Sequence, residues 1–498
     1  MSESISENPL HPKSLTHSSL GHFLWMFGGG SVQAILKILV LMILSRLLTP
    51  AEFGLVAAAT TIVALAEVFG KIGIAPSIVQ ARVLTPEHIR TGTTATLVSG
   101  VLVGVVVYAI AEPLGRLYAI EALAPLVRVF AFLFVLRALG LVSEALIQRE
   151  SGFRGLAVIT VLSYMIGYAG VAIVLALLGF GVWALVAGQM AQVALQSLLL
   201  IHFAGYRLRP GFDYPKFKGM LRFGFGTTLA QIGNYAALNV DYFIVGRVLG
   251  VEPLGLYSRA YLLLSQPANL VGNMADKVLF PVLASVQTDF ARVMRAYEKT
   301  LALTAITQIP LSIYLCVYGQ EVVHFLMGRQ WGAAVLPFQI MVCSLYFRTA
   351  YKFTGTVLRA IGAVYQAALL QWTYAGLVAL GAVVGVTFGL TGVAIGTTAA
   401  VVIFFFLGQV LLAFRHGLLI GQSFFTLLRH MAVGLVYAIL LFGSRQLEEP
   451  LGLPPWAGLA IGAGVGVVIY VGLHKFWPRA LGPEREAIAS LARRFLRR

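Results

Sequence analysis

The sequence predicts an all-α integral membrane protein, and three observations carry that prediction. Of its 498 residues, 59% are hydrophobic and only 11% are charged, whereas soluble domains carry about 25% charged residues. Apolar stretches recur from end to end, each about 20 residues long, which is enough to cross about 30 Å of hydrocarbon. The stretches lack the alternation of a barrel strand, so only helices would satisfy their backbone in lipid.

The apolar stretches predict about fourteen transmembrane helices. We place them near residues 22–48, 53–75, 92–112, 124–147, 156–178, 182–204, 223–248, 254–284, 299–318, 334–358, 363–387, 390–414, 424–444 and 455–473. The first stretch is too long for a signal peptide and has no small-residue cleavage site, so we expect it to be retained. An even number of spans places both ends of the chain on the same side of the membrane.

The positive charge of the chain predicts which side that is. The formal net charge is +16, and most Lys and Arg residues fall in the segments that face the cytoplasm if the N-terminus is cytoplasmic. Such a bias is what the positive-inside rule describes, so the N- and C-termini are both expected in the cytoplasm. The charge is then a topology signal, and no nucleic-acid partner is needed to explain it.

An internal repeat predicts two lobes. The segment from Ser45 to Leu55 aligns with Gly246 to Leu256, 201 positions later, and this register places Gln33 on Asn234. Six spans per half give a parallel repeat related by an axis along the membrane normal, with a lumen between the lobes. The predicted domains are a cytoplasmic segment 1–21, an N-lobe 22–206, an amphipathic cytoplasmic linker 207–222, a C-lobe 223–414, two further spans in 415–474 and a basic cytoplasmic tail 475–498.

No motif for a metal, a nucleotide or a catalytic centre appears. Cys316 and Cys343 form no CxxC or CxxH pattern, and the nine histidines have no ligand spacing. There is no GxxxxGK[ST] phosphate loop, which disfavours ATP as the energy source. We therefore expect no cofactor, no metal and no catalytic residues.

Charged residues within the predicted spans are the candidate functional residues, because each costs about 3 kcal/mol at the bilayer centre. Arg348, Lys352 and Arg359 share one helical face. Like charges four residues apart repel each other, so this stripe suits a diphosphate or an acidic sugar. The alternative is pairing with Asp241, Asp276 or lipid phosphates. Other cations expected to face the lumen are Lys37 and Arg259.

Polar residues of the second and seventh spans are further candidates for a lumen wall or a coupling-ion site. Glu67 and Lys71 are four apart in the favourable acid-first order, which also fits a structural ion pair. Gln231, Asn234 and Asp241 fall on one helical face. Their alternative role is interhelical hydrogen bonding, which is common in membrane bundles.

Several short motifs, in order and spacing, carry a family resemblance over roughly residues 20 to 415. They are Leu48–Gly54, Gly73–Ala75, Gln148–Glu150, Asn239–Asp241, Val245–Arg247, Leu254–Tyr257 and Gly328–Trp331. The sequence resembles Wzx-type flippases, in the polysaccharide transporter branch of the multidrug/oligosaccharidyl-lipid/polysaccharide (MOP) exporter superfamily.

The resemblance implies a V-shaped, two-lobe transporter in the bacterial inner membrane. Its substrate would be an undecaprenyl-diphosphate-linked oligosaccharide for exopolysaccharide or lipopolysaccharide biosynthesis, and its partners would be membrane lipids, a polysaccharide polymerase and a chain-length regulator. Two alternatives remain. A cation-coupled drug antiporter of the same fold would need an acidic residue in the first span, where Lys37 stands. A membrane polymerase or ligase would need a large periplasmic loop, and the longest outward connection is about residues 112–123.

Overall fold

The computed structural model is helical throughout, with no strand among the residues that it describes. These residues are 33–70, 73–81, 83–150, 152–205, 209–417, 420–448 and 454–476. Within these described ranges, ten helices are long and apolar enough to cross a membrane, or eleven if one bent pair is counted as a single span. The all-α class is thereby confirmed, while the count of fourteen spans stays a prediction. The segment 1–21 and nearly all of the tail 475–498 lie outside the described residues.

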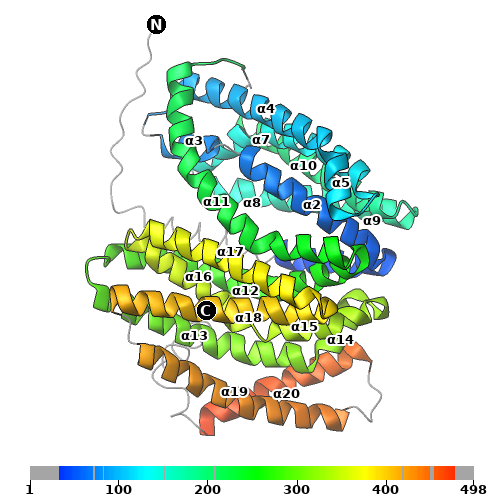
Figure 1. Ribbon diagram of the computed structural model, residues 1–498, viewed down its shortest axis with the longest axis vertical. Coiled ribbons are helices and arrows are strands. Elements are labelled where there is room, and N and C mark those ends of the chain that lie inside the picture. The colour runs from blue at the N-terminus through cyan, green and yellow to red at the C-terminus, as the bar shows by residue number, and fades with distance from the viewer. Residues whose placement is uncertain are drawn as a thin grey trace.

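The helices that precede residue 205 pack on one another and form what we call the N-terminal group (Figure 1). Its members are a helix at 33–47, α2 (Pro50–Gly70), α3 (Ile74–Gln80), α4 (Pro86–Ala109), α5 (Ala111–Tyr118), α6 (Leu123–Phe130), α7 (Phe132–Arg149), α8 (Phe153–Leu162), η1 (Ser163–Gly170), α9 (Val171–Leu177) and α10 (Val182–Ala204). One of these, η1, is a π-helix, and it continues α8 into α9 without a break.

A second set of helices, the C-terminal group, lies beside the first (Figure 1). Its members are α12 (Val251–Ser285), α13 (Phe290–Val317), α14 (Gly319–Met327), η2 (Arg329–Ala334), α15 (Val335–Val342), α16 (Leu345–Ala360), α17 (Val364–Val386) and α18 (Gly389–His416). The segment Arg329–Val342 meets α16 at a bend of 49°, so the tenth predicted span is broken.

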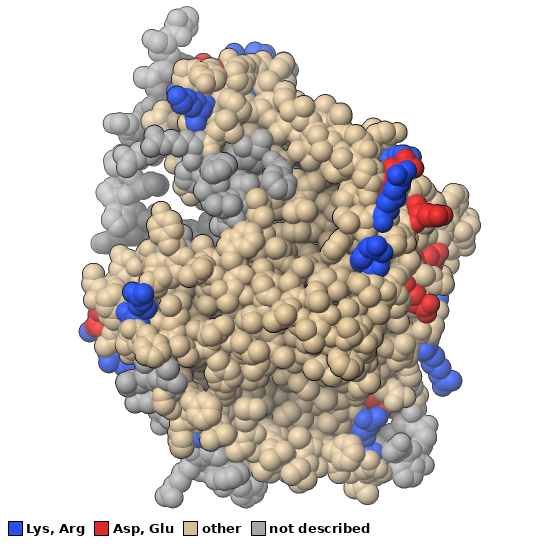
Figure 2. Space-filling model, in the orientation of Figure 1, with Lys and Arg blue, Asp and Glu red and all other residues tan. Residues whose placement is uncertain are grey.

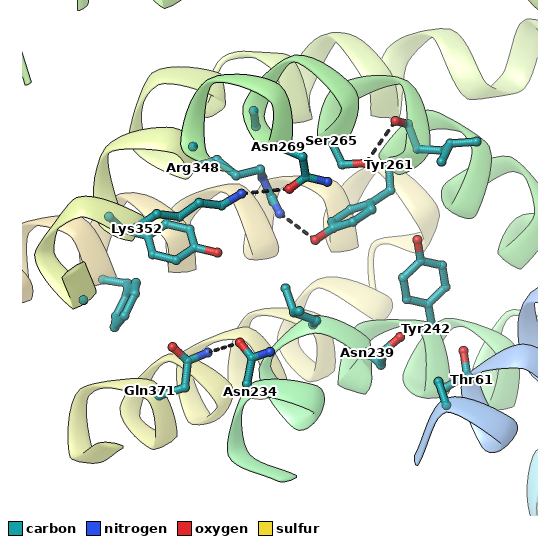
Figure 3. Close-up of a pocket in the computed structure, with 18 of the residues that line it drawn as sticks. Thr61, Asn234, Asn239, Tyr242, Tyr261, Ser265, Asn269, Arg348, Lys352 and Gln371 are labelled. Atoms are coloured by element: carbon teal, nitrogen blue, oxygen red, sulfur yellow. Dashed lines mark hydrogen bonds between the residues drawn. The ribbon is translucent and has the colours of Figure 1, made fainter. Parts of the chain in front are cut away.

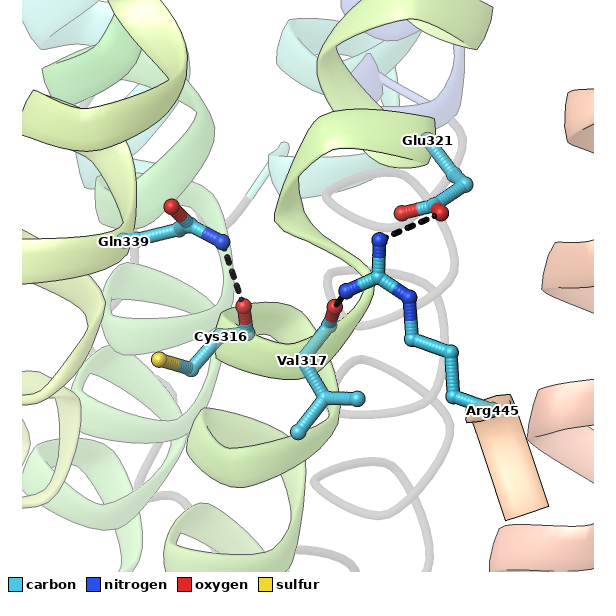
Figure 4. A network of polar contacts seen from close by, with 5 residues as sticks. All are labelled: Cys316, Val317, Glu321, Gln339 and Arg445. Atoms are coloured by element: carbon cyan, nitrogen blue, oxygen red, sulfur yellow. Dashed lines mark hydrogen bonds and ion pairs between the residues drawn. The ribbon is translucent and has the colours of Figure 1, made fainter. Parts of the chain in front are cut away.

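The last two helices, α19 (Ile420–Glu448) and α20 (Pro455–Phe476), pack on the outside of the C-terminal group (Figure 1). Arg445 of α19 attaches them: its Nη2 lies 2.9 Å from a carboxylate oxygen of Glu321 in α14. Its Nη1 donates to the carbonyl oxygen of Val317 (Figure 4). A side chain that would be costly in lipid is thus paired inside the protein.

Helix α11 (Tyr214–Val248) crosses from one group to the other (Figure 1). At its start, the Asp213 side chain accepts a hydrogen bond from the Lys216 amide at 3.1 Å, a typical N-cap. The Asp213 amide in turn donates to Thr91 of α4 at 3.0 Å, while the C-terminal half of α11 packs on α17. The structure therefore differs from the predicted linker 207–222, because residues 214–222 are the first turns of a 35-residue helix.

The two groups share one hydrophobic core near the N-terminal ends of α2 and α12. There, Phe53 meets the fully buried Trp331 edge to face, with ring centroids 5.5 Å apart. The Trp331 indole N–H donates to the Ser45 carbonyl oxygen at 2.9 Å, and Arg46 donates to the Phe325 carbonyl oxygen at 2.8 Å. Both bonds join the N-terminal group to the C-terminal group, at the end predicted to face the periplasm.

The surface matches a protein surrounded by lipid. On the face shown in Figure 2, Lys, Arg, Asp and Glu gather near the two ends of the helices, and a broad belt without such charges lies between them. Many large apolar side chains are exposed, among them Leu102, Val105 and Leu380 at 60–62%. Such a belt would be unfavourable in water and is expected in a bilayer.

Candidate functional site

A cavity of about 650 Å³, here called the central cavity, lies between the two groups of helices (Figure 3). Most of its wall comes from α11, α12, α16 and α17, and α2 of the N-terminal group completes it. It borders the shared core at Ala57, and its lining extends along the helices to Arg359 and Ala367. The lumen predicted between two lobes stays a prediction, and this cavity is the candidate for it.

The central cavity is lined by cations. Arg348, Lys352 and Arg359, which we call the cation stripe, all line it from α16, because spacings of four and eleven residues return to one helical face. Arg259 contributes a fourth positive charge from α12. Among the described residues that line the cavity there is no Asp or Glu. The cavity therefore offers a positive environment of low dielectric constant to an anion.

Arg348 is the most buried member of the stripe, with 5% of its surface exposed. Its Nη1 donates to the Tyr261 hydroxyl at 2.9 Å, and its guanidinium carbon lies 4.8 Å from the centroid of the Tyr261 ring (Figure 3). The Nε–H has no hydrogen-bond partner in the described part of the chain. A buried donor without a partner is unfavourable, so Arg348 has capacity for a ligand in the cavity.

Neutral side chains orient the other two members of the stripe. Lys352 Nζ donates to Asn269 Oδ1 at 2.8 Å, across from α16 to α12 (Figure 3). Arg359 Nη2 donates to Thr356 Oγ1 at 3.2 Å within α16. These contacts help to position the two charges at the cavity wall.

Arg259 lies at the boundary between the central cavity and a smaller pocket of about 190 Å³. Its guanidinium carbon sits 4.7 Å from the centroid of the Phe53 ring, a cation–π contact between the two groups of helices. Lys37, Tyr164 and Tyr168 line the same small pocket from the other side. Lys37, which was expected beside the stripe, therefore does not reach the central cavity.

Lys37 and Glu67 line a third cavity, of about 490 Å³, inside the N-terminal group. We call this the N-terminal cavity. Glu67 pairs there with Arg137 of α7, a partner that spacing within one helix could not reveal. Lys71, expected to pair with Glu67, lies outside the described residues.

Of the three polar residues predicted on one face of α11, the structure places Asn234 and Asp241 in different surroundings. Asn234 lines the central cavity, where its Oδ1 accepts a hydrogen bond from Gln371 at 3.2 Å (Figure 3). The Gln231 side chain lies outside the described part of the structure. Asp241 is buried, with 3% of its surface exposed, and it does not line the central cavity. The structure therefore corrects the prediction that Asp241 lies in the lumen wall.

Asp241 instead joins three helices. Its Oδ2 accepts from the Tyr257 hydroxyl at 2.8 Å, and its Oδ1 accepts from the Tyr242 amide at 3.0 Å. The Tyr257 hydroxyl also lies 3.2 Å from Thr397 of α18. This agrees with the interhelical hydrogen bonding that was the alternative for Asp241, since polar groups in lipid seek internal partners.

Sequence reasoning found Arg259 on the α12 side of the cavity but missed the uncharged polar residues there. Tyr261, Ser265 and Asn269 all line it and follow one another at intervals of four residues (Figure 3). That spacing places them on one helical face. A polar stripe in an apolar span was the signal that could have found them.

The side chains that line the central cavity provide positive charge and hydrogen-bonding groups. No group of three or more His, Cys, Asp or Glu gathers to hold a metal ion in the part of the chain that the structure describes. The free thiols are Cys316, half-buried, and Cys343, exposed. What the central cavity can do is bind an anion through Arg and Lys donors, surrounded by tyrosine and amide side chains.

The chain matches known proteins of polysaccharide biosynthesis. The family model described as "Polysaccharide biosynthesis protein" matches residues 43–336. The succinoglycan biosynthesis transport protein ExoT of Rhizobium meliloti is 29% identical over 357 residues, covering 70% of this chain and 72% of ExoT. The lipopolysaccharide biosynthesis protein WzxC of Escherichia coli is 26% identical over 320 residues, covering 64% of this chain and 65% of WzxC.

Solved structures share the fold at low sequence identity. The lipid II flippase MurJ, in an inward closed conformation, superposes with a TM-score of 0.72 at 14% identity, over 91% of this chain and 99% of MurJ. An inward-facing multidrug resistance MATE family transporter of the MOP superfamily superposes with a TM-score of 0.62 at 16% identity, over 76% of this chain and 94% of that one. From the family match over more than half of its length, the chain belongs to the polysaccharide biosynthesis protein family.

Proposed function

We propose that this protein is a flippase that moves an undecaprenyl-diphosphate-linked oligosaccharide from the cytoplasmic to the periplasmic leaflet of the bacterial inner membrane. The observation that carries the proposal is the central cavity, where Arg259, Arg348, Lys352 and Arg359 face one space without a carboxylate among its described lining residues. A transporter for polysaccharide biosynthesis needs to carry an anionic diphosphate through hydrocarbon. Four cations in a cavity of about 650 Å³ would offset that cost.

The shared core suggests which way the cavity faces. Ser45, Trp331 and Phe53 hold the two groups of helices together at the end predicted to be periplasmic. In the proposed cycle this is the inward-facing state, and the diphosphate binds the cation stripe from the cytoplasm. Movement to the outward-facing state must break this contact. Substrate can drive that movement only if it binds the outward-facing state more tightly than the inward-facing one. We place the fourteen spans in two lobes of six, arranged as a V, with both termini in the cytoplasm.

We also propose that Asp241 couples transport to an ion gradient, the other role predicted for it. It is a buried carboxylate within the C-terminal group, held by Tyr257. If it couples transport, Asp241→Asn should abolish the dependence of export on a sodium or proton gradient. Export that still responds fully to collapse of each gradient would leave Asp241 with a structural role only.

The two alternative functions suit the site less well. A drug antiporter that carries cations would need acids where the central cavity presents Arg and Lys. A polymerase or ligase would need catalytic residues in a large outward-facing loop. Among the outward connections that the structure describes, the helices are short, such as α5, eight residues long, and α14, nine residues long. A polymerase and a chain-length regulator are instead proposed as partners.

Deletion of the gene tests the proposal. The deletion strain should lose its surface polysaccharide and accumulate undecaprenyl-diphosphate-linked repeat units, measured by mass spectrometry of lipid extracts. Expression of the wild-type protein should reverse both effects. Unchanged surface polymer together with no accumulated lipid-linked glycan would overturn the proposal.

A further inference from the structure

The N-terminal cavity is lined by four glutamines that the function described so far does not use. Gln33 comes from the first helix, and Gln189, Gln192 and Gln196 come from α10. Spacings of three and four residues place the last three on one face of α10. None of the four side chains makes a hydrogen bond within the described part of the chain.

Unpartnered amides are unfavourable in a membrane span. A primary amide carries two donors and an acceptor, and without partners it costs free energy away from water. Three of them on one face of a 23-residue apolar helix are difficult to explain as packing. Amides that present both donors and acceptors to a cavity do, however, match the hydroxyl groups of sugars.

Two tyrosines add an aromatic surface to the same cavity. Tyr164 and Tyr168 stack with ring centroids 5.3 Å apart and an interplanar angle of 18°. Both belong to the π-helix η1, a type of helix often found at functional sites. η1 packs tightly on α10, since a Cβ at Gly167 would lie 2.5 Å from Gln192 Cα. This close approach places the tyrosine pair beside the glutamines, where its rings can contact the C–H faces of a sugar.

The charges of the N-terminal cavity differ from those of the central cavity. Its described lining includes two bases, Lys37 and Arg137, and two acids, Glu67 and Glu144, so the formal charges balance. Glu67 and Arg137 already form an ion pair. A diphosphate would therefore gain less here than at the cation stripe, whereas a hydroxyl-rich neutral group would meet suitable partners.

The small pocket lies between the two cavities and shares lining residues with each. Tyr164, Tyr168 and Lys37 line both the N-terminal cavity and the small pocket, while Arg259 and Leu262 line both the small pocket and the central cavity. We propose that the N-terminal cavity binds the carbohydrate part of the lipid-linked substrate, through the four glutamines and the tyrosine pair. This inference rests on the proposed function, and it assigns the diphosphate to the central cavity and the sugars to the N-terminal one.

Binding to the purified full-length protein tests the assignment. The probes are undecaprenyl diphosphate alone and undecaprenyl diphosphate carrying a neutral glucose tetrasaccharide, with affinities measured by native mass spectrometry. The test variant is the triple substitution Gln189→Leu, Gln192→Leu and Gln196→Leu. The matched control is Gln446→Leu, because Gln446 is exposed on α19 and lines none of the three cavities.

The triple variant should bind the glycosylated probe at least about tenfold more weakly, the change expected for loss of one or two hydrogen bonds, and undecaprenyl diphosphate as well as before. Its melting temperature should not fall, since the amides have no protein partners to lose. Unchanged affinity for the glycosylated probe, or an equal loss for both probes, would overturn the inference.

Failure of the proposed function gives a different result. Arg348→Ala should weaken binding of both probes, because both carry the diphosphate. If Arg348→Ala binds both probes as well as the wild type does, the diphosphate is not at the cation stripe. That result would contradict the proposed function regardless of the glutamine variant.

Discussion

Gly54 of α2 and Gly255 of α12 each lie against the backbone of the other's helix, and the two contacts are reciprocal. A Cβ at Gly54 would lie 1.8 Å from the Val251 carbonyl oxygen, and a Cβ at Gly255 would lie 1.8 Å from the Pro50 carbonyl oxygen. Both pairs, Gly54 with Gly255 and Pro50 with Val251, are 201 positions apart, the offset of the internal repeat. This is the contact that a two-fold axis between two repeats produces.

Alanine at either glycine should disrupt this contact. At 1.8 Å from a backbone oxygen, the added methyl group forces the helices apart, and overpacking of this kind costs about 1–3 kcal/mol or more. We expect Gly54→Ala and Gly255→Ala to lower the melting temperature of the detergent-solubilised protein to a similar extent. Gly376→Ala in α17 is the control, because nothing lies within 4 Å of a Cβ there. A wild-type melting temperature for both variants would contradict the reciprocal contact.

Neutral or acidic residues at Arg348 and Lys352 should abolish polymer export without lowering protein abundance. The cavity would lose the positive charge that offsets a diphosphate, and Glu should be worse than Ala. Arg348→Lys should rescue only partly, since an ammonium cannot bind phosphate with two parallel hydrogen bonds. Surface polysaccharide and immunoblots of the membrane fraction measure the two quantities. If the Ala and Glu variants export at wild-type rates, the stripe is structural.

A disulfide across the shared core should stop transport reversibly. The Ser45 hydroxyl lies 3.4 Å from the Leu326 carbonyl oxygen, between the two groups of helices. In a chain with Cys316→Ser and Cys343→Ser, the pair Ser45→Cys and Leu326→Cys should crosslink under oxidation. Export should then fall and return after reduction, while each single cysteine variant stays active. Full export by a completely crosslinked protein would mean that this contact does not open during transport.

Arg445→Met should loosen the last two helices without changing transport by the molecules that remain folded. The change removes the ion pair with Glu321 and the bond to the Val317 carbonyl oxygen (Figure 4). Because both charged side chains are about a quarter exposed, we expect a loss of about 1–2 kcal/mol in stability. Abundance and melting temperature should fall, and export per molecule should stay near the wild-type level. A selective loss of export would give α19 a direct role in transport.

Reporter fusions at Met1 and Arg498 should both read as cytoplasmic. This follows from the even number of predicted spans and from the bias of Lys and Arg toward the segments on that side. Alkaline phosphatase, which is active only in the periplasm, and a fluorescent protein that matures in the cytoplasm give opposite signals at each end. A periplasmic C-terminus would show that the span count is wrong by one.

The cation stripe shows how much the sequence revealed. Helical periodicity alone placed Arg348, Lys352 and Arg359 on one face, and the composition alone required the membrane as solvent. The repeat also paired the segment around Gly54 with the segment around Gly255. These properties are local or periodic, so the order of residues along the chain is enough to determine them.

Contacts between segments far apart in the chain were decided only by the tertiary structure. The Glu67 partner proved to be Arg137, Asp241 turned toward Tyr257 and away from the central cavity, and Lys37 faced a separate cavity. Helical periodicity fixes the face on which a side chain lies. The neighbour that this face meets depends on the rotation and crossing of packed helices, which no spacing within one helix contains.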